Sequence, residues 1–246
     1  MNNQLAEFES ISAETQIPLP PMLKDLLASG ATEYGPDWQS TYRERILNNP
    51  PAFINFGDFE WIDAETARIE IKSWLIPQVQ GGRRFLPFAQ SGAGDMYCLM
   101  PYEAPDGQQL LGVSLVWHDS DSSQIDHASF RDFVCSHYLE AFADLNELVG
   151  NYSTEGALQA IRADVSQATR FMSDADREYL ESFCRSELLQ QRPFQSGPRR
   201  PPEACWSLLS EEQLRVEVQK LPSPDITFDV IAPWEVPNYE ELRSGG

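Results

Sequence analysis

The sequence LPFAQSGAGDMYCLMPYEAPDGQQLLGVSLVWHDSDSSQIDHASFRDF, residues 86–133, decides the fold of this chain. It contains two apolar runs with the character of strands, Asp95–Met100 and Leu111–Trp117, and the segment between them carries the turn signal Pro105-Asp106-Gly107. A turn flanked by alternating apolar residues predicts a β-hairpin, because the turn residues accept unusual backbone angles while each strand buries one face.

A third strand and a long helix are predicted on either side of this hairpin. Ser91–Asp95 predicts a turn, and Arg84–Ala89 before it predicts a strand, so three strands follow one another as an antiparallel meander. Ser129 is placed as the N-cap of a helix whose apolar residues recur every three or four positions as far as Val149. We expect this helix to pack on the sheet and to end at Gly150-Asn151.

Periodicity and turn residues predict the remaining elements. Further helices are predicted at residues 1–13, 22–28, 36–47, 154–172 and 174–190, strands at Ala67–Ile76 and Ile226–Ile231, and a last short helix behind the capping box Ser210–Gln213. Arg192–Pro202 is predicted to be a proline-rich loop and Pro233–Gly246 a tail. The expected fold class is α+β, with an antiparallel sheet of about four to six strands backed by helices. We expect two domains, an α+β domain at 1–149 and a mostly helical C-terminal extension at 150–246.

The charge balance restricts the partners of this chain. It has 38 acidic and 18 basic residues and a formal net charge of −20. Nucleic acids and anionic membranes attract positive charge, so neither is expected as a direct partner. The charge favours a basic protein partner, or it serves solubility alone.

The cysteines and the N-terminus indicate a cytoplasmic protein. Four cysteines are widely spaced and show no Cys-x-x-Cys motif, which favours reduced thiols over a disulfide framework or a zinc site. The N-terminus lacks the basic and apolar regions of a signal peptide. No apolar run approaches the roughly 20 residues that span a bilayer.

The histidines do not form a strong catalytic or metal-binding signature. His118 and Asp119, with Asp121 nearby, could form a metal or acid–base site, but the favoured interpretation is a turn rich in Asp and Ser that caps the strand. His127 could join them in space. His137 lies on the apolar stripe of its helix and is interpreted as a core residue.

The other candidate motifs also favour structural roles. Cys98 and Cys135 lie in a strand and a helix expected to be buried, and a cysteine nucleophile would need an electropositive environment. Ser91–Asp95 lacks the lysine of a phosphate-binding loop and ends in a carboxylate, so it is interpreted as a turn. Arg199-Arg200 in the proline-rich loop is interpreted as solvated. We therefore expect no enzyme, no metal and no cofactor.

Clustered acidic residues are the clearest functional signal. Eleven acidic residues lie between Asp95 and Glu155, with Arg131 as the one base among them. Such a field accelerates association with a basic partner by about 10- to 10³-fold. The residues predicted to bind the partner are Asp119, Asp121, Asp126, Asp132, Glu140, Asp144 and Glu147.

The order of several motifs resembles the SUKH superfamily, which contains the Smi/Knr-type domain. The resemblance rests on Leu86–Ala89, on Gly94–Leu99, on Gly112–His118, on the helix opening Ala128–Phe133 and on the Leu-Pro helix entry Ile17–Leu23. It covers roughly residues 17–149. It implies an α+β domain with an antiparallel sheet and a protein-binding function, since bacterial members are largely immunity proteins that neutralise toxins, often nucleases.

Three hypotheses follow from these observations. The leading one is a cytoplasmic immunity protein that blocks a cognate toxin, a basic nuclease domain, through its acidic surface and without catalysis. The second is a regulatory protein-interaction scaffold related to cell-wall synthesis or signalling. The third is a metal-dependent hydrolase that uses His118 and Asp119.

Overall fold

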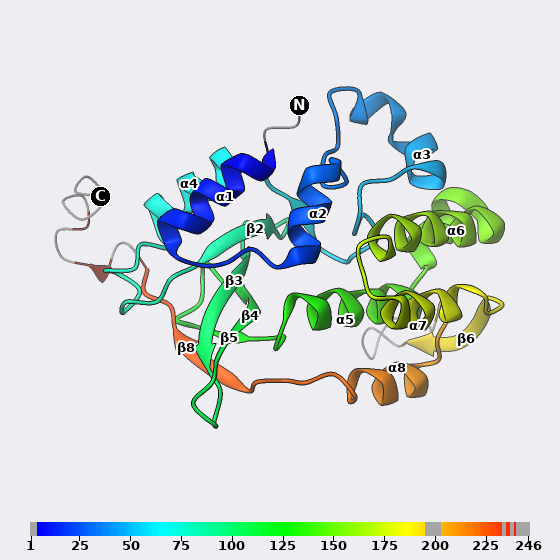
Figure 1. Cartoon of the computed structure of the whole chain (residues 1–246). Helices are drawn as coiled ribbons and strands as arrows, with labels where there is room; N and C mark the ends of the chain where they lie inside the picture. The colour runs from blue at the N-terminus through cyan, green and yellow to red at the C-terminus, as the bar shows by residue number, and fades with distance from the viewer. Residues whose placement is uncertain (1–3, 195–202, 233–234, 237–238, 240–246) are drawn as a thin grey trace. The chain divides into compact units, whose positions relative to one another are not determined.

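A computed structural model describes residues 4–194, 203–232, 235–236 and 239 (Figure 1). The chain forms two compact units, each assembled from separate parts of the sequence. The first unit contains Met1–Gly30, Asp58–Phe133 and Pro222–Gly246, and the second contains Ala31–Gly57 and Val134–Leu221. The division into domains at 1–149 and 150–246 stays a prediction. The fold class is α+β, as predicted.

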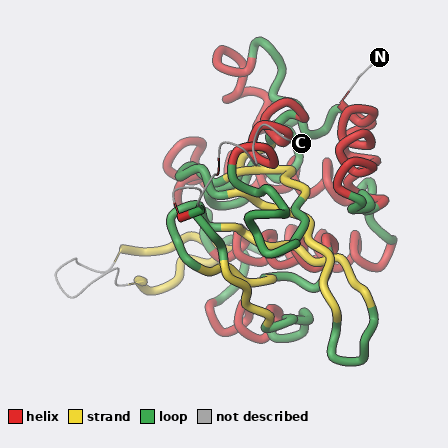
Figure 2. The backbone as a smooth tube through the Cα atoms, turned by 90° about the vertical axis from the view of Figure 1, so that its left-hand side faces the viewer, coloured by secondary structure: helices red, strands yellow, loops and turns green. Residues whose placement is uncertain are grey.

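The first unit is built on a four-stranded antiparallel sheet with the strand order β1-β2-β3-β4. Its strands are β1 (Glu60–Trp61), β2 (Leu86–Gln90), β3 (Met96–Glu103) and β4 (Gln109–Val116). The predicted hairpin is confirmed: β3 and β4 pair from Met96↔Val116 to Glu103↔Gln109. Gly107 closes the hairpin turn with a φ of 83°, a left-handed conformation that glycine adopts without steric cost. The strands, including this long hairpin, are also visible in Figure 2.

A small second sheet continues this layer beyond β4. It consists of β5 (Ser122–Ile125) and β8 (Ile226–Asp229), which pair antiparallel, so the predicted strand near residue 226 is confirmed. Side chains as well as backbone groups join β5 to β4. The amide of Leu115 donates to Asp126 Oδ2 at 2.8 Å, the amide of Trp117 donates to the Ser123 hydroxyl at 3.0 Å, and Val113 exchanges backbone hydrogen bonds with His127.

The helices α1 (Gln4–Thr15), α2 (Pro21–Ser29) and α4 (Ala64–Ser73) belong to the same unit, and α1 and α4 contact β2 (Figure 1). The expected strand at Ala67–Ile76 is wrong, because most of this segment is the helix α4. Asp63 caps the helix by accepting a hydrogen bond from the amide of Thr66 at 2.7 Å. Ala64 and Ala67 are buried at helical spacing, whereas Ile69, assigned to the buried face of the strand, is 55% exposed.

An aromatic cluster forms the core between the sheet and the start of α5 (Phe130–Ala143). Phe88 on β2 lies with its ring centroid 5.5 Å from that of Phe130 and 5.6 Å from that of Phe133. Tyr97 on β3 lies 5.7 Å from Phe133. The first turn of α5 therefore packs on the sheet as its apolar spacing predicts.

The second unit is mainly helical. It contains α3 (Trp38–Asn48), the greater part of α5, α6 (Asn146–Thr169), α7 (Asp174–Cys184), α8 (Glu211–Val218) and the hairpin of β6 (Leu189–Phe194) and β7 (Glu203–Ser207). Helix α7 ends at Cys184, whereas the helix was predicted to continue to Gln190. The strand β6 extends to Phe194 and so includes the first residues of the segment predicted to be a loop. Arg199 and Arg200, with most of that loop, lie outside the described residues, as does most of the predicted tail.

The single helix expected from Ser129 to Val149 is wrong, because α5 ends at Ala143. The Asp144 side chain accepts a hydrogen bond from the amide of Asn146 at 2.9 Å, which competes with helical pairing. The amide of Leu145 donates to the carbonyl of Trp206 on β7 at 2.7 Å instead of to its own helix. Helix α6 is then interrupted at Ser153, whose φ is 70°, so its main part starts where the helix from residue 154 was predicted.

The predicted capping box at the start of α8 is confirmed. The Ser210 hydroxyl accepts from the amide of Gln213 at 3.1 Å, and the Gln213 side chain accepts from the amide of Ser210 at 2.8 Å. Both hydrogen bonds join residues three positions apart, so the sequence pattern was sufficient to predict them.

Candidate functional site

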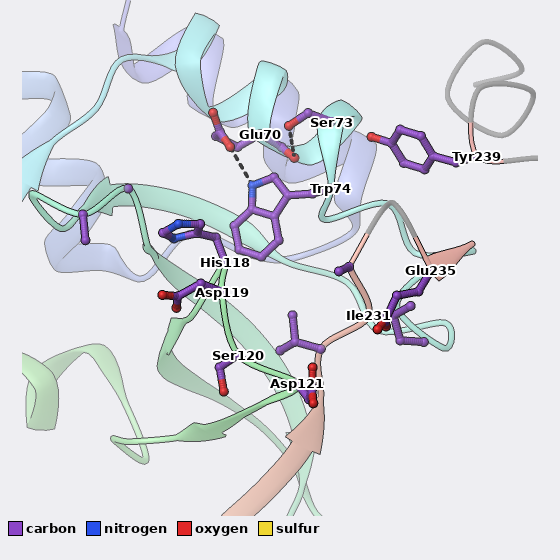
Figure 3. Close-up of a pocket in the computed structure, with 14 residues that line it drawn as sticks. Glu70, Ser73, Trp74, His118, Asp119, Ser120, Asp121, Ile231, Glu235 and Tyr239 are labelled. Carbon is purple, nitrogen blue, oxygen red and sulfur yellow. Dashed lines mark hydrogen bonds between the residues drawn. The ribbon is translucent and has the colours of Figure 1, made fainter. Parts of the chain in front are cut away.

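A cavity of about 470 Å³ opens in the first unit (Figure 3). Four segments surround it: the end of α4, the β2–β3 turn, the β4–β5 turn and the chain that follows β8. The residues that carry its chemistry are Glu70, Trp74, His118, Asp119, Asp121 and Glu235. Segments separated by more than a hundred positions in the sequence therefore form one site.

His118 is held by a buried carboxylate at the base of the β2–β3 turn. Its ring Nδ1 lies 2.7 Å from Asp95 Oδ1, and its backbone amide donates to the same oxygen at 3.1 Å. Asp95 is only 3% exposed, and its other oxygen accepts from the Ser91 hydroxyl at 3.0 Å. These contacts fix the position of the imidazole at the cavity.

The segment Ser91–Asp95 is a turn, and it places Asp95 beside His118. The amide of Ser91 donates to the carbonyl of Asp95 at 2.8 Å, and the amide of Gly94 donates to the carbonyl of Ser91 at 3.0 Å. Gly94 has a φ of 93°, which favours glycine. The interpretation of this motif as a turn is confirmed.

Trp74 forms an aromatic wall of the cavity. Its indole Nε1 donates to Glu70 Oε2 at 2.6 Å, one helical turn earlier, and its side chain is largely buried. Figure 3 shows the indole below Glu70, with the His118 ring beside it. Neither Glu70 nor Trp74 was predicted as a site residue, because the sequence pattern placed both on a strand, where they would not share this geometry.

Asp95, His118 and Asp119 bring three potential metal-ligand atoms within 4.8 Å of one another. Both oxygens of Asp95 are already hydrogen-bonded, to His118 and to Ser91. A metal at this position would therefore rely on the second ring nitrogen of His118 and the carboxylate of Asp119, fewer protein ligands than the three or four of typical zinc sites. The donor set fits a hydrogen-bonded Asp–His pair better than a metal centre.

The seven acidic residues predicted to bind a partner differ in what they do in the structure. Asp119 and Asp121 are exposed at the cavity. Asp126 joins β5 to β4, and burial raises the pKa of its carboxyl. Asp132 is 6% exposed and holds the start of α5, accepting from the Ser129 hydroxyl at 2.7 Å and from Arg131 at 2.9 Å.

The other three predicted residues belong to the second unit. Glu140, Asp144 and Glu147 are all exposed. Asp144 also accepts the amide hydrogen bond that ends α5. Thus five of the seven carboxylates are exposed and two are part of the internal structure, while the binding role of all seven stays a prediction.

The remaining histidines lie against aromatic and backbone groups rather than at the cavity. Burial lowers the pKa of His127 to about 4, so its ring is neutral at physiological pH. His127 pairs with Val113 through its backbone, and His137 lies 5.1 Å from the ring of Phe56. The structure does not bring His127 into the constellation of His118 and Asp119 that the sequence left open.

The cysteines predicted to be structural are buried. Cys98 and Cys135 are each 0% exposed. Burial raises the pKa of the Cys98 thiol well above its ordinary value, which disfavours the thiolate that a nucleophile requires.

The comparison with protein families agrees with this architecture. The sequence profile of the SMI1 / KNR4 family (SUKH-1) matches residues 3–136. This match covers more than half of the chain, and the chain belongs to that family. The matched segment contains β1–β5 and three of the four segments around the cavity, whereas the chain after β8 lies beyond it.

Two further comparisons found nothing comparable. No curated protein and no solved structure matches the chain significantly. Among the described residues, none of the helices combines the length and the hydrophobicity needed to span a membrane.

Proposed function

We propose that this chain is a cytoplasmic immunity protein that binds a cognate toxin, a basic nuclease domain, and blocks it without catalysis. Its membership of the SUKH-1 family supports a protein-binding role. The observation that carries the proposal is the exposure of Asp119 and Asp121 beside the cavity in a chain of net charge −20. An exposed negative surface attracts a basic nuclease face and covers the groups that the nuclease uses for its anionic substrate.

The mechanism is occlusion rather than turnover. Blocking a partner needs no catalytic group, and burial of Cys98 disfavours the thiolate that a cysteine nucleophile requires. Long-range attraction brings the partner to the surface, and close packing then determines how long the complex lasts.

Capture of the tagged full-length protein from its native cells, followed by mass spectrometry, tests this function. We expect a stoichiometric basic domain of a toxin, whose activity the purified protein inhibits at equimolar concentration. A captured housekeeping or wall-synthesis protein that is not inhibited would contradict immunity and would favour the regulatory scaffold.

The electrostatic part has a separate test in the association rate. The double variant Asp119→Asn/Asp121→Asn should slow association with the toxin and flatten its dependence on salt, since long-range attraction is screened by ions. The matched control is Glu103→Gln/Asp106→Asn, which removes the same charge from the opposite end of the β3–β4 hairpin, at about 3.3 Å per residue along the strands. Equal effects of the two double variants would remove the claim that the surface near the cavity binds the partner.

A further inference from the structure

The cavity of the first unit combines three features that a protein does not need for solubility and that are typical of a binding site. It is a concave space of about 470 Å³, within the range of about 300–1,000 Å³ typical of ligand sites. It has a largely buried aromatic wall, Trp74, and it contains a positioned imidazole, His118. An acidic surface that only keeps a protein soluble needs neither a concavity nor an ordered aromatic wall.

Apart from the His118 imidazole, the ionisable acid and base side chains that carry the charge of this cavity are carboxylates. Carboxylates come from each of three surrounding segments: Glu70 from α4, Asp119 and Asp121 from the β4–β5 turn, and Glu235 from the chain after β8. Among the described residues that line the cavity there is no lysine or arginine. The cavity therefore favours a cation and rejects an anion.

The aromatic wall of the cavity favours one kind of cation, a flat guanidinium or an ammonium group. The indole of Trp74 is held in place by the hydrogen bond from its Nε1 to Glu70, so its face is presented in a fixed orientation. Indole faces attract guanidinium and ammonium groups, and tryptophan is the strongest of the aromatic side chains in this respect. Arginine stacks on aromatic rings and also binds carboxylates through two parallel hydrogen bonds, which suits a site that offers both.

One wall of the cavity is formed by residues after β8, which lie outside the segment that matches the family. Val230 donates its amide to the carbonyl of Asp121 at 2.9 Å, and the buried Gln80 side chain exchanges two hydrogen bonds with the backbone of Ile231. These contacts place the chain after β8 beside the β4–β5 turn, outside residues 3–136. The shape of the site is therefore set partly by a segment that the family profile does not contain.

We infer that this cavity is the anchor site for an arginine side chain of the protein partner. The guanidinium stacks against Trp74 and pairs with the carboxylates of the β4–β5 turn, while the aliphatic stem contacts the apolar wall formed by Val230 and Ile231. Such an anchor is typical of protein interfaces, where buried arginines contribute a large share of the binding energy. This inference rests on the proposed binding function, since it names the side chain that the acidic surface receives.

The inference can be tested without knowing the partner. N-acetyl-arginine amide is titrated into the isotope-labelled full-length protein at low salt, and the chemical shifts of the Trp74 indole and of the amides of Gly94, His118 and Ile231 are followed. We expect saturable shifts confined to the cavity. N-acetyl-citrulline amide, which has the same shape and no charge, should produce at most a tenth of these shifts at the same concentration.

Variants locate the binding to the cavity. Each of Asp119→Asn and Asp121→Asn should raise the dissociation constant of the arginine probe by about fivefold, the size expected for one charge pair close to water. The control Glu103→Gln/Asp106→Asn should leave it within about twofold of the unaltered protein. All of these side chains are exposed, so the variants keep the fold.

The outcomes separate this inference from the proposed function. Equal shifts with citrulline, shifts spread away from the cavity, or no shift at all would overturn the arginine site. Toxin inhibition by the protein would still support immunity in that case. Conversely, specific arginine binding in a protein that inhibits no captured toxin would support the site and contradict immunity.

Discussion

Asp164 on α6 is the most unusual single residue of the second unit. It is fully buried, and its carboxylate accepts hydrogen bonds from the amides of Phe53 and Asn55, from the Asn55 side chain and from the Tyr138 hydroxyl, at 2.7 to 3.0 Å. Burial raises the pKa of Asp164 to about 6, although these four hydrogen bonds act in the opposite direction. The carboxylate joins the loop before β1 to two helices of the unit.

We expect Asp164→Asn to lower the free energy of unfolding by about 3 kcal/mol at pH 7. The asparagine offers one acceptor oxygen where the carboxylate offers two, so buried donors lose their partners. The measurement is urea unfolding followed by circular dichroism. Glu155→Gln, an exposed change of the same kind on α6, should change stability by less than about 0.5 kcal/mol.

A comparison of Asp164→Asn with the unaltered protein also gives a prediction for the dependence of stability on pH. Because the pKa of Asp164 is higher in the folded chain than its ordinary value of 3.8, the folded chain binds the proton more tightly. The resulting stabilisation is complete below about pH 4 and is lost as the pH rises through about 6. The stability difference between the unaltered protein and Asp164→Asn should therefore narrow from pH 4 to pH 7, by up to about 3 kcal/mol. A difference that widens over this range would contradict the raised pKa.

The contact between β4 and β5 depends on a glycine. A Cβ on Gly112 would lie 2.5 Å from Ile125 Cγ2 and 2.8 Å from the carbonyl oxygen of His127. The second contact is with backbone and cannot be relieved by a side-chain rotation. Gly112 thus lets β5 approach β4 closely enough for Asp126 and Ser123 to form their hydrogen bonds.

Gly112→Ala is therefore expected to destabilise the protein by about 2 kcal/mol through overpacking. Thermal unfolding measures this effect directly. Gly150→Ala is the matched substitution at an open site, since a Cβ there meets nothing within 4 Å, and it should be neutral or stabilising by up to about 1 kcal/mol. If Gly112→Ala were as harmless as Gly150→Ala, β5 would not lie against β4 as described.

The helix α4 shows why some segments were assigned the wrong type of secondary structure from the sequence. The alternation of Ile69, Glu70 and Ile71 is typical of a strand, but the N-cap Asp63 and the acidic residue in the first turn specify a helix start. The capping signal determined the outcome. Conversely, Ser210–Gln213 was predicted correctly because its two reciprocal hydrogen bonds involve neighbouring residues alone.

The chain returns to its first unit after passing through the second. The buried side chain of Gln80 secures this return. Its Nε2 donates to the carbonyls of Trp74 and Ile231, each at 2.9 Å, and its Oε1 accepts from the amide of Ile231 at 3.1 Å. The Gln80 side chain thus satisfies both backbone hydrogen-bonding groups of Ile231, as a neighbouring strand would.

We expect Gln80→Leu to loosen the segment 226–232. Loss of two to three buried hydrogen bonds should raise the hydrogen-exchange rate of peptides from this segment by about 30- to 100-fold. Gln78→Leu, an exposed change two residues earlier in the same loop, is the control and should leave exchange there unchanged. Unaltered exchange in Gln80→Leu would show that the β5–β8 pairing holds the segment alone.

Features that depend only on neighbouring residues could be predicted from the amino-acid pattern. These are the β3–β4 hairpin, the turn at Ser91–Asp95, the capping box at Ser210 and the resemblance to the SUKH superfamily, which the family match of residues 3–136 confirms. Tertiary structure decided which carboxylates are exposed: Asp95 and Asp132 are buried, whereas Asp119 and Asp121 border the cavity. It also brought Trp74 and the chain after β8 to the same site. The physical reason is that burial and pairing between distant segments depend on the completed fold, so they cannot be predicted from the local periodicity of the sequence.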